Sequence, residues 1–226
     1  MDKIPEIVSS SISQNIQQVN RISSNTQNVN TVGFKALINT PQSTLSNSVN
    51  HQKVLDTSQG EIKQTGRNLD LAIHGDGWFF LRKNKEIMLS RNGQFQLDNK
   101  GFVVGSNGFR LQGTEGDIQV ESSYVKIDRN GTISFEDRDL EQVLLVKAPK
   151  IDAGQYRAGN LYFKKLPRLD VVQNNRILQG YLEQSNVDPS SEVIDLMNAK
   201  RHIQTMQKSL AAYDQVIKKA ISELGK

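Results

Sequence analysis

The sequence predicts an α+β protein in which long N- and C-terminal helices pair as a coiled coil, with an inserted, mainly antiparallel β domain. Three observations predict it: a thin apolar stripe at helical spacing near the N-terminus, an unbroken heptad repeat near the C-terminus, and alternating apolar and polar residues with Asn-Gly turns between them. The domains expected are an N-terminal helix (1–36), an extended linker (37–65), the β domain (66–180) and a C-terminal helix (181–226).

The first predicted helix runs from about Ile4 to Asn28 and carries apolar residues at four- and three-residue intervals. Asn15 and Thr26 fill the remaining positions of that spacing. Because most other positions are polar, the stripe is too narrow to anchor a core alone and needs a partner. From this stripe we assign four residues to an assembly seam: Val8, Ile12, Val19 and Ile22.

The second predicted helix supplies that partner. Asp188 or Ser190 is suited to cap its start, with Pro189 in the first turn and Glu192 close behind. A leucine or isoleucine recurs every seven residues from Leu196 onward, which is the spacing of a coiled coil. The seam residues assigned on this helix are Leu196, Ile203, Met206, Leu210, Tyr213, Ile217 and Leu224. An amphipathic helix lying on its own domain's core is the alternative, but a narrow, sustained stripe at both chain ends favours the seam.

The region between the helices has the pattern of strands and tight turns. The stretch "FQLDNKGFVV" predicts a hairpin with its loop at Asp98 to Gly101, and "VKIDRNGTISF" predicts another that turns at Asn130-Gly131. The stretch "LEQVLLVKAP" predicts one buried strand that ends at Pro149. Trp78 and the phenylalanines that follow it alternate with polar or glycine positions, as on the inner face of a sheet.

Composition excludes several classes of protein. The 226 residues carry a net charge of +4, and the basic residues are scattered among acids, which indicates a solvated surface and no nucleic-acid partner. With no cysteine, neither a disulfide framework nor a thiolate site is available. We expect a protein that is not membrane-embedded, since no apolar run reaches the ~18 residues of a membrane span. The first residues lack the pattern of a secretory signal peptide, so we expect either a cytoplasmic protein or export without a cleaved signal.

Catalytic and metal-binding patterns are equally sparse. His51, His74 and His202 have no neighbours at ligand spacing, and "HGDGWFF" predicts a glycine turn before a strand at Trp78 to Leu81, not a phosphate loop. No G-x-S-x-G elbow occurs. The sequence therefore predicts no enzyme, no cofactor, no metal and no small-molecule substrate, and a role in assembly instead.

Four stretches, in this order along the chain, resemble the basal-body rod and hook family of bacterial flagellar axial proteins. They are "NVNTVGFKA", "SQGEIKQTGRNLDLAIHGDGWFFL", "LSRNGQFQLDNKGFVVGSNGFRLQG" and "LEQSNVDPSSEVIDLM". The first stretch is similar to the family's signature after its first helix, and it assigns a joint made of Asn28, Asn30, Thr31, Gly33 and Phe34. The short middle, the Asp76–Trp78 variant and the "LLVKAP" strand are most similar to the proximal-rod branch, with the distal-rod branch as the close alternative.

The resemblance implies a structural role. Members of the family polymerise helically into a drive shaft that transmits torque from motor to hook, with paired terminal helices as an inner tube and β domains facing outward. It implies that the partners of this protein are further copies of itself, other flagellar rod proteins and the flagellar type III export apparatus. It also implies that the protein is located in the basal body of the cell envelope. Within such a tube we expect the Gly33 joint to act as a hinge between layers, where a change harms assembly more than folding. A coiled-coil-tethered β adhesin or tail-like component, which would form a closed trimer, is the alternative of another class; an enzyme with an unrecognised site is the third.

Overall fold

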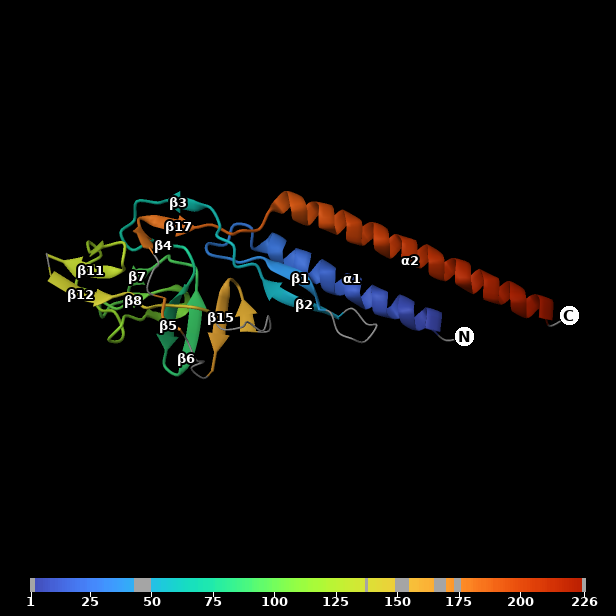
Figure 1. The fold of residues 1–226 in the computed structure, drawn as a ribbon, viewed down its shortest axis with the longest axis horizontal. Coiled ribbons are helices and arrows are strands. Elements are labelled where there is room, and N and C mark those ends of the chain that lie inside the picture. Colours follow the sequence, from blue (N-terminus) through green and yellow to red (C-terminus); the bar gives the residue numbers. More distant parts are fainter. Residues whose placement is uncertain are drawn as a thin grey trace. The chain divides into compact units, whose positions relative to one another are not determined.

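The computed structural model describes residues 3–42, 50–136, 138–148, 155–164, 170–172 and 176–224. The chain divides into two compact units, one formed by Met1–Gln27 with Asp188–Lys226 and the other by Asn28–Val187. We call them the helical unit and the β unit (Figure 1). Mainly antiparallel sheets and the two long helices make the protein α+β, as the sequence predicted.

The helical unit contains α1 (Lys3–Gln27) and α2 (Pro189–Leu224), which lie side by side and run antiparallel (Figure 1). The direction follows from the contacts, because Asn15 meets His202 whereas Arg21, further along α1, meets Glu192. Of the two predicted caps, Asp188 holds the start of α2, where its Oδ1 accepts a hydrogen bond of 3.0 Å from the Ser190 amide. α1 ends at Gln27, so residues 28–36, which we had assigned to the helical layer, belong to the β unit.

The largest sheet of the β unit is antiparallel and follows the order β14-β15-β6-β5-β9-β8-β7, with β13 also paired to β5. Its strands are short, as expected where Asn-Gly and Asp-x-x-Gly turns follow one another closely. The bounds are β5 (Trp78–Lys83), β6 (Glu86–Ser90), β7 (Gln96–Leu97), β8 (Val103–Val104), β9 (Arg110–Leu111), β13 (Leu145–Val146), β14 (Tyr156–Arg157) and β15 (Asn160–Phe163), with a 3-10 turn, η1 (Ser106–Gly108), before β9.

Smaller sheets surround it. One has three strands, β10 (Lys126–Ile127), β11 (Thr132–Phe135) and β12 (Arg138–Gln142), and another is the hairpin β1 (Leu37–Gln42) with β2 (Asn50–Leu55). Two further pairs join early strands to late ones: β3 (Ile62–Gln64) with β17 (Tyr181–Glu183), and β4 (Leu71–His74) with β16 (Arg176–Gln179). The last two strands before α2 therefore pair with β3 and β4, which come early in the β unit.

The core of the β unit consists of two hydrophobic clusters on opposite faces of β5. Trp78 belongs to one cluster together with Phe34 and Leu161, whereas Phe79, the next residue, belongs to the other together with Phe95. Successive side chains of a strand point to opposite faces, so β5 is buried on both sides. Our prediction of a single aromatic inner face was wrong for this reason: both faces of the strand carry aromatic side chains that are covered.

The predicted hairpins are confirmed, because β7 pairs with β8 and β10 pairs with β11, both antiparallel. Two other expectations need correction. The stretch predicted as one buried strand before Pro149 forms β12 and β13, which belong to different sheets, and Leu140 in β12 is exposed. The segment 37–65, expected to be an extended linker, contains β3 and the hairpin β1–β2. Hairpin pairing satisfies the backbone polar groups that an isolated extended segment would leave to water.

Candidate functional site

The assembly residues predicted on the helices lie mostly on the faces that α1 and α2 turn to each other. On α1, Ile22 is buried, and its three partners in the stripe, Val8, Ile12 and Val19, are partly buried. On α2 the partly buried seam residues are Ile203, Met206, Leu210, Tyr213 and Ile217. Leu196 differs, because its side chain is 45% exposed, and the side chain of Leu224 lies outside the described residues.

Polar contacts, which the sequence reasoning missed, join the first turns of α2 to the end of α1. The Arg21 guanidinium donates to Glu192 Oε1 at 3.2 Å and to Asp195 Oδ2 at 2.6 Å, and Asn25 Nδ2 donates to Glu192 Oε1 at 2.6 Å. Glu192 and Arg21 are both buried. The signal was present in the sequence, because Arg21 is the lone charge in the middle and end of the first helix.

A second polar contact lies further along the pair. Asn15 is buried and its side chain lies 2.9 Å from His202 Nδ1 and 3.5 Å from Met206 Sδ. Asn15 was noted in the sequence as an apolar-stripe position filled by a polar residue. A buried polar residue at such a position fixes the register and the orientation of two helices, at some cost in stability.

The predicted joint is a run of tight turns within the β unit. The Thr31 amide donates to the Asn28 carbonyl and the Phe34 amide to the Thr31 carbonyl, at 3.0 and 3.2 Å. Asn28 and Thr31 also join through their side chains, while Asn30 is exposed. Gly33 has φ +69° and is buried; a Cβ built there would lie 2.3 Å from the Arg91 carbonyl carbon. Gly33 is therefore required twice, by its left-handed backbone and by the close approach of Arg91.

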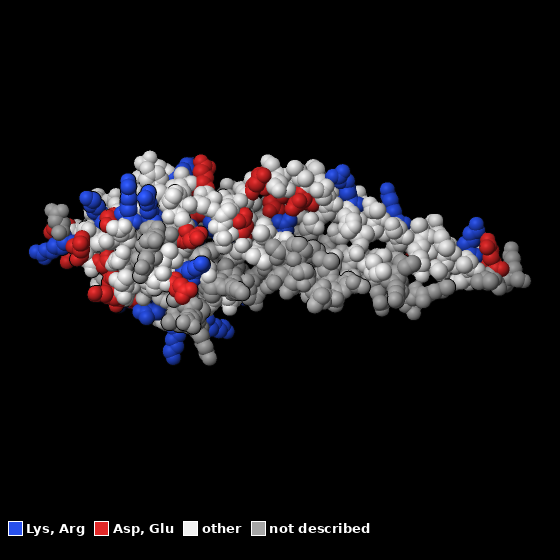
Figure 2. All heavy atoms as spheres, viewed as in Figure 1, with Lys and Arg blue, Asp and Glu red and all other residues white. Residues whose placement is uncertain are grey.

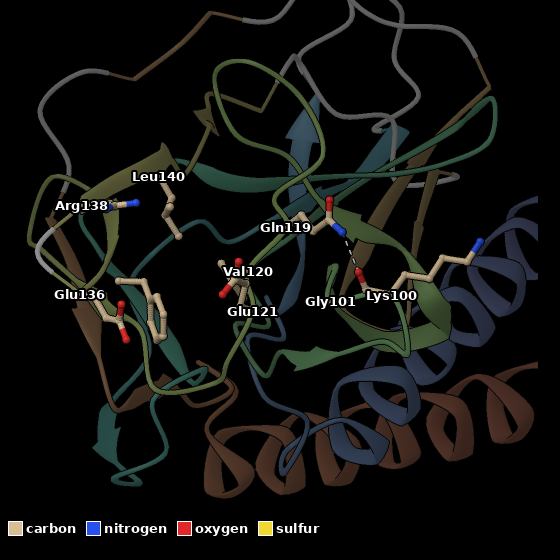
Figure 3. A pocket seen from close by; sticks show the side chains of 9 residues that line it. Lys100, Gly101, Gln119, Val120, Glu121, Glu136, Arg138 and Leu140 are labelled. Carbon is tan, nitrogen blue, oxygen red and sulfur yellow. Dashed lines mark hydrogen bonds between the residues drawn. The ribbon is translucent and has the colours of Figure 1, made fainter.

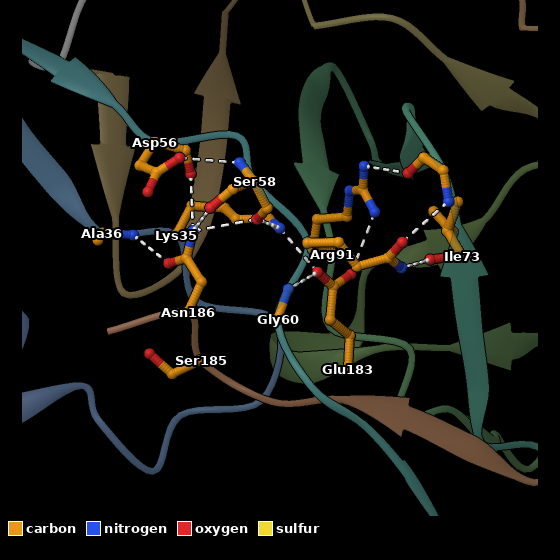
Figure 4. Close-up of polar contacts among 12 residues, drawn as sticks. Lys35, Ala36, Asp56, Ser58, Gly60, Ile73, Arg91, Glu183, Ser185 and Asn186 are labelled. Carbon is orange, nitrogen blue, oxygen red and sulfur yellow. Dashed lines mark hydrogen bonds and ion pairs between the residues drawn. The ribbon is translucent and has the colours of Figure 1, made fainter. Parts of the chain in front are cut away.

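Next to Gly33 lies a buried ionic cluster centred on Glu183, which we call the Glu183 cluster: Lys35, Arg91, Glu183 and the Gly60 amide (Figure 4). Lys35 Nζ lies 2.7 Å from Glu183 Oε1 and Arg91 Nη1 lies 3.1 Å from Glu183 Oε2. The Gly60 amide also donates to Oε1, at 3.0 Å. Each carboxylate oxygen thus has charged or amide donors, which is what a buried carboxylate requires.

Two further hydrogen bonds join the cluster to backbone carbonyls, whereas the buried Arg91 Nε has no hydrogen-bond partner among the described residues. Lys35 Nζ donates to the Ser58 carbonyl at 2.6 Å, and Arg91 Nη2 donates to the Gly75 carbonyl at 2.7 Å (Figure 4). Burial lowers the pKa of Lys35 from its ordinary value, and the adjacent Glu183 carboxylate opposes that change. The cluster is therefore a structural ion network in which the Glu183 carboxylate is the shared counter-charge of Lys35 and Arg91.

The segments that bracket the β unit meet beside this cluster. The Gly33 amide donates to the Glu183 carbonyl at 2.7 Å, and the Asn186 amide donates to the Phe34 carbonyl at 3.3 Å. The Asn186 side chain accepts from the Ala36 amide at 2.7 Å and donates to the Asp56 carbonyl at 3.0 Å. The segment after α1 and the segment before α2 are consequently bound to each other inside the β unit (Figure 4).

Phe34 anchors the joint on its apolar side. It is 1% exposed, and its ring centroid lies 5.5 Å from that of Tyr156. The Tyr156 oxygen accepts a 2.6 Å hydrogen bond from the Lys35 amide, and burial raises the pKa of the Tyr156 phenol. Tyr156 therefore holds both residues that follow Gly33, Phe34 through its ring and Lys35 through its hydroxyl.

A cleft of about 680 Å³ opens elsewhere on the β unit, between the turn at Lys100 and β12 (Figure 3). Lys100 and Arg138 contribute positive charges to its lining, and Glu121 and Glu136 contribute negative ones. Gln119 Nε2 donates to the Lys100 carbonyl at 2.8 Å. The described residues of the lining thus carry equal numbers of positive and negative side chains.

Among the described residues, no group of three His, Asp or Glu side chains could hold a metal ion. None of the helices described is long and apolar enough to cross a membrane.

Comparison with known proteins accounts for this arrangement. The family description "Flagellar hook protein FlgE/F/G D1 domain" matches residues 72–135, and "Flagellar basal body rod FlgEFG protein C-terminal" matches residues 178–223. These matches cover β4 to β11 in the β unit, then β16, β17 and most of α2. The chain belongs to the flagellar basal-body rod and hook family.

Relatives within that family align over almost the whole chain. The flagellar basal-body rod protein FlgG of Bacillus subtilis is 28% identical, over 89% of this chain and 91% of the relative. FlgF of Caulobacter vibrioides is 27% identical over 93% of both chains, and FlgF of Rhizobium meliloti is 27% identical over 92% of both. The four stretches that carried the resemblance supply Gly33 and Lys35, Gly60, Arg91, and Glu183, so the family's motifs converge on the Glu183 cluster.

Proposed function

We propose that this chain is a structural subunit of the bacterial flagellar basal-body rod, polymerising helically into the drive shaft that transmits torque from motor to hook. The observation that carries this proposal is the alignment with rod proteins over about nine tenths of both lengths. Relatives named FlgG and FlgF both align, so the branch is a finer proposal: the proximal rod, with the distal rod or a hook-type axial protein as the alternative.

In the assembled rod, α1 and α2 form a coiled-coil inner layer and the β unit forms an outer one. Supporting this, the heptad positions of α2 from Ile203 to Ile217 are partly buried along its face toward α1, although Leu196 is exposed. The seam covers only a narrow stripe of each helix, so the rest of both helical surfaces can contact neighbouring copies. Each subunit would thereby resist shear through many staggered contacts.

The partners of this subunit are further copies of itself, other flagellar rod proteins and, on the way out of the cell, the flagellar type III export apparatus. Its location is the rod within the cell envelope. The chain contains no cysteine, which is compatible with assembly outside the cytoplasm because no thiol can be oxidised there.

The test is removal of the gene and analysis of basal bodies. We expect cells without this chain to be non-motile, with basal bodies that stop short of a hook, and a plasmid copy to restore both. Purified basal bodies should contain the chain as a fixed multiple of other rod proteins. Swimming cells with complete hooks after the deletion would overturn the proposal, whereas a detached closed trimer would favour the adhesin-like alternative.

A further inference from the structure

The residues that lead into α2, 176–187, complete parts of the β unit that come much earlier in the chain; we call them the closing segment. They contain β16, which pairs with β4, and β17, which pairs with β3. Between these strands the Gly180 amide donates to the Asp70 carbonyl at 2.7 Å, and the Gly180 carbonyl accepts from the Thr65 amide at 2.8 Å. In the sheets described, β3 and β4 pair with no other strand, so the closing segment supplies the strand partner of both.

The closing segment also belongs to both hydrophobic clusters of the β unit. Ile177 lies in the cluster that contains Phe79, and Val187 lies in the cluster that contains Trp78. Leu182, between them in the chain, is buried as well. Without the closing segment each cluster would lose a side chain and be left with a cavity, which lowers the stability of a packed core. The apolar core of the β unit is therefore complete only when the closing segment has docked.

Glu183 brings the charge that buried cations of the earlier segments need. Figure 2 shows Lys and Arg side chains beside Asp and Glu side chains on the surface of the β unit, where water also solvates them. Lys35 and Arg91 are buried instead, and the Glu183 carboxylate is their shared counter-charge, at 2.7 and 3.1 Å (Figure 4). Without it, folding would bury two cations next to each other, at a large cost in free energy. The segments that carry Lys35 and Arg91 are therefore stable in their folded places only after Glu183 has docked.

We propose that the closing segment is a latch: the β unit stays open until residues 176–187 dock, and their docking completes its strand pairs, its core and its ion network together. Docking comes late in folding because Lys35 and Glu183 are 148 positions apart. The chain entropy lost in closing so long a loop is offset only after nearer contacts have formed. The hairpin of β5 and β6, which are neighbours in the chain, needs no such loop.

The latch needs the segments on both sides of the β unit at the same time. The Gly33 amide donates to the Glu183 carbonyl at 2.7 Å, and the Asn186 side chain accepts from the Ala36 amide at 2.7 Å. The segment after α1 and the closing segment thus bind each other. A chain held in a narrow passage has only one of them outside, so its β unit stays open until the other has left. This consequence rests on the proposed function, since it concerns passage through an export apparatus.

The test cuts the full chain just before the closing segment. A protease recognition site inserted between Asn174 and Asn175, outside the described residues, lets the purified chain be cut into fragments 1–174 and 175–226, which are then separated in urea. The readout is the rate of tryptic cleavage after Lys35, which is buried in the folded chain. We expect this cleavage to be at least about tenfold faster in fragment 1–174 alone than in the uncut chain, and fragment 175–226 to restore the slow rate when it is added back.

Two variants of fragment 175–226 show what drives docking. Glu183→Gln removes the counter-charge and keeps the shape of the side chain. Ile203→Asp interrupts the apolar stripe of α2 and leaves the closing segment unchanged. We expect the Ile203→Asp fragment, at saturating concentration, to restore the slow cleavage after Lys35. The Glu183→Gln fragment should leave that cleavage at least about tenfold faster, because Lys35 and Arg91 again lack their counter-charge.

Three outcomes would overturn the latch. Slow cleavage after Lys35 in the longer fragment alone would show that the β unit closes without residues 176–187. Failure of the unsubstituted shorter fragment to restore slow cleavage would show that the closing segment does not hold the β unit closed. Restoration that depends on Ile203 and not on Glu183 would assign the closure to the helices. None of these outcomes bears on the rod assignment, which the gene deletion tests separately.

Discussion

Lys35 Nζ lies 2.7 Å from Glu183 Oε1, although the two residues are 148 positions apart in the chain. Both side chains are almost fully excluded from solvent, at 1% and 0% exposure. A buried charge is tolerated only when opposite charges and hydrogen bonds replace water. This pair, together with Arg91, therefore holds the segment after α1 and the segment before α2 to the same point of the β unit.

Glu183→Gln should lower the free energy of unfolding by about 3–5 kcal/mol, because it leaves Lys35 and Arg91 as buried cations without a counter-charge. The amide keeps the shape of the side chain, so the loss reports the charge. Urea denaturation followed by circular dichroism measures it. Glu86→Gln, at an exposed position, is the control and should change the same quantity by less than about 0.5 kcal/mol. Equal effects of the two substitutions would contradict the role of the Glu183 cluster.

Gly33→Ala should destabilise the β unit strongly, since the added methyl group would lie 2.3 Å from the Arg91 carbonyl carbon in a backbone with φ +69°. The matched control is Gly66→Ala, where φ is +75° but nothing lies within 4 Å. Only the backbone strain, about 1 kcal/mol, applies at Gly66. Thermal melts of the two variants separate the two causes; a melting temperature of Gly33→Ala as high as that of Gly66→Ala would show that the Arg91 backbone moves aside freely.

The close approach of Arg91 to Gly33 makes folding depend on this residue, whereas its role as a hinge in assembly stays a prediction. Its turn conformation could be predicted, because glycine after Asn and Thr signals a left-handed turn. Its packing against Arg91 could not, because contacts between distant segments depend on the sheet order. For the same reason scattered basic residues indicated a solvated surface, an interpretation that is wrong for Arg21, Lys35 and Arg91, all of which are buried.

The helices and short hairpins were the predictable part of the fold. A heptad repeat and an Asn-Gly turn are local signals, and both specify backbone geometry within a few residues. The outward position of the Leu196 side chain was harder to predict from the sequence. It holds a heptad position, but Asp195 binds Arg21 at that level of the pair and the α1-facing side is polar there. A polar contact between helices therefore overrode the apolar repeat.

Acid should destabilise the protein partly through Asp117. Desolvation alone would raise the pKa of this carboxyl, but hydrogen bonds from Arg110, Gln112 and Arg82 outweigh it and lower the pKa below the ordinary 3.8. A lowered pKa in the folded state contributes stability above the unfolded pKa, and that contribution is lost as the pH falls through the folded pKa. Asp117→Asn should therefore be less stable than the unsubstituted chain at pH 7, and the difference should shrink toward pH 2.

Urea midpoints measured between pH 2 and 7 check this prediction. Glu115→Gln, two residues away and exposed, is the control and should reproduce the pH profile of the unsubstituted chain. A constant offset of Asp117→Asn across the whole range would show that the substitution acts through packing and not through the carboxylate charge.

Trypsin should distinguish lysines of the two units. Lys35 is 1% exposed and held by Glu183, so cleavage after it requires the β unit to open. Lys200 and Lys208 are exposed on α2, where local fraying of a narrow helix pair suffices. We expect early fragments that end within 200–219 and a resistant core that retains Lys35, as measured by fragment masses. In Glu183→Gln the cut after Lys35 should appear early; its persistence as a late cut would argue that Lys35 is protected by other contacts.

Ile203→Asp should abolish rod assembly and leave the β unit folded. Ile203 is a partly buried residue on the side of α2 that faces α1, so a carboxylate there loses solvation and leaves the apolar stripe interrupted. The neighbouring Gln204 is exposed and lies outside the apolar stripe, so Gln204→Asp adds the same charge without interrupting the stripe. Cells that carry Ile203→Asp as the sole copy should not swim and their basal bodies should lack the chain, whereas Gln204→Asp cells should swim normally. The β unit serves as the internal standard, because its tryptic core should remain in both variants. Normal motility of Ile203→Asp cells would show that the heptad stripe is dispensable for the shaft.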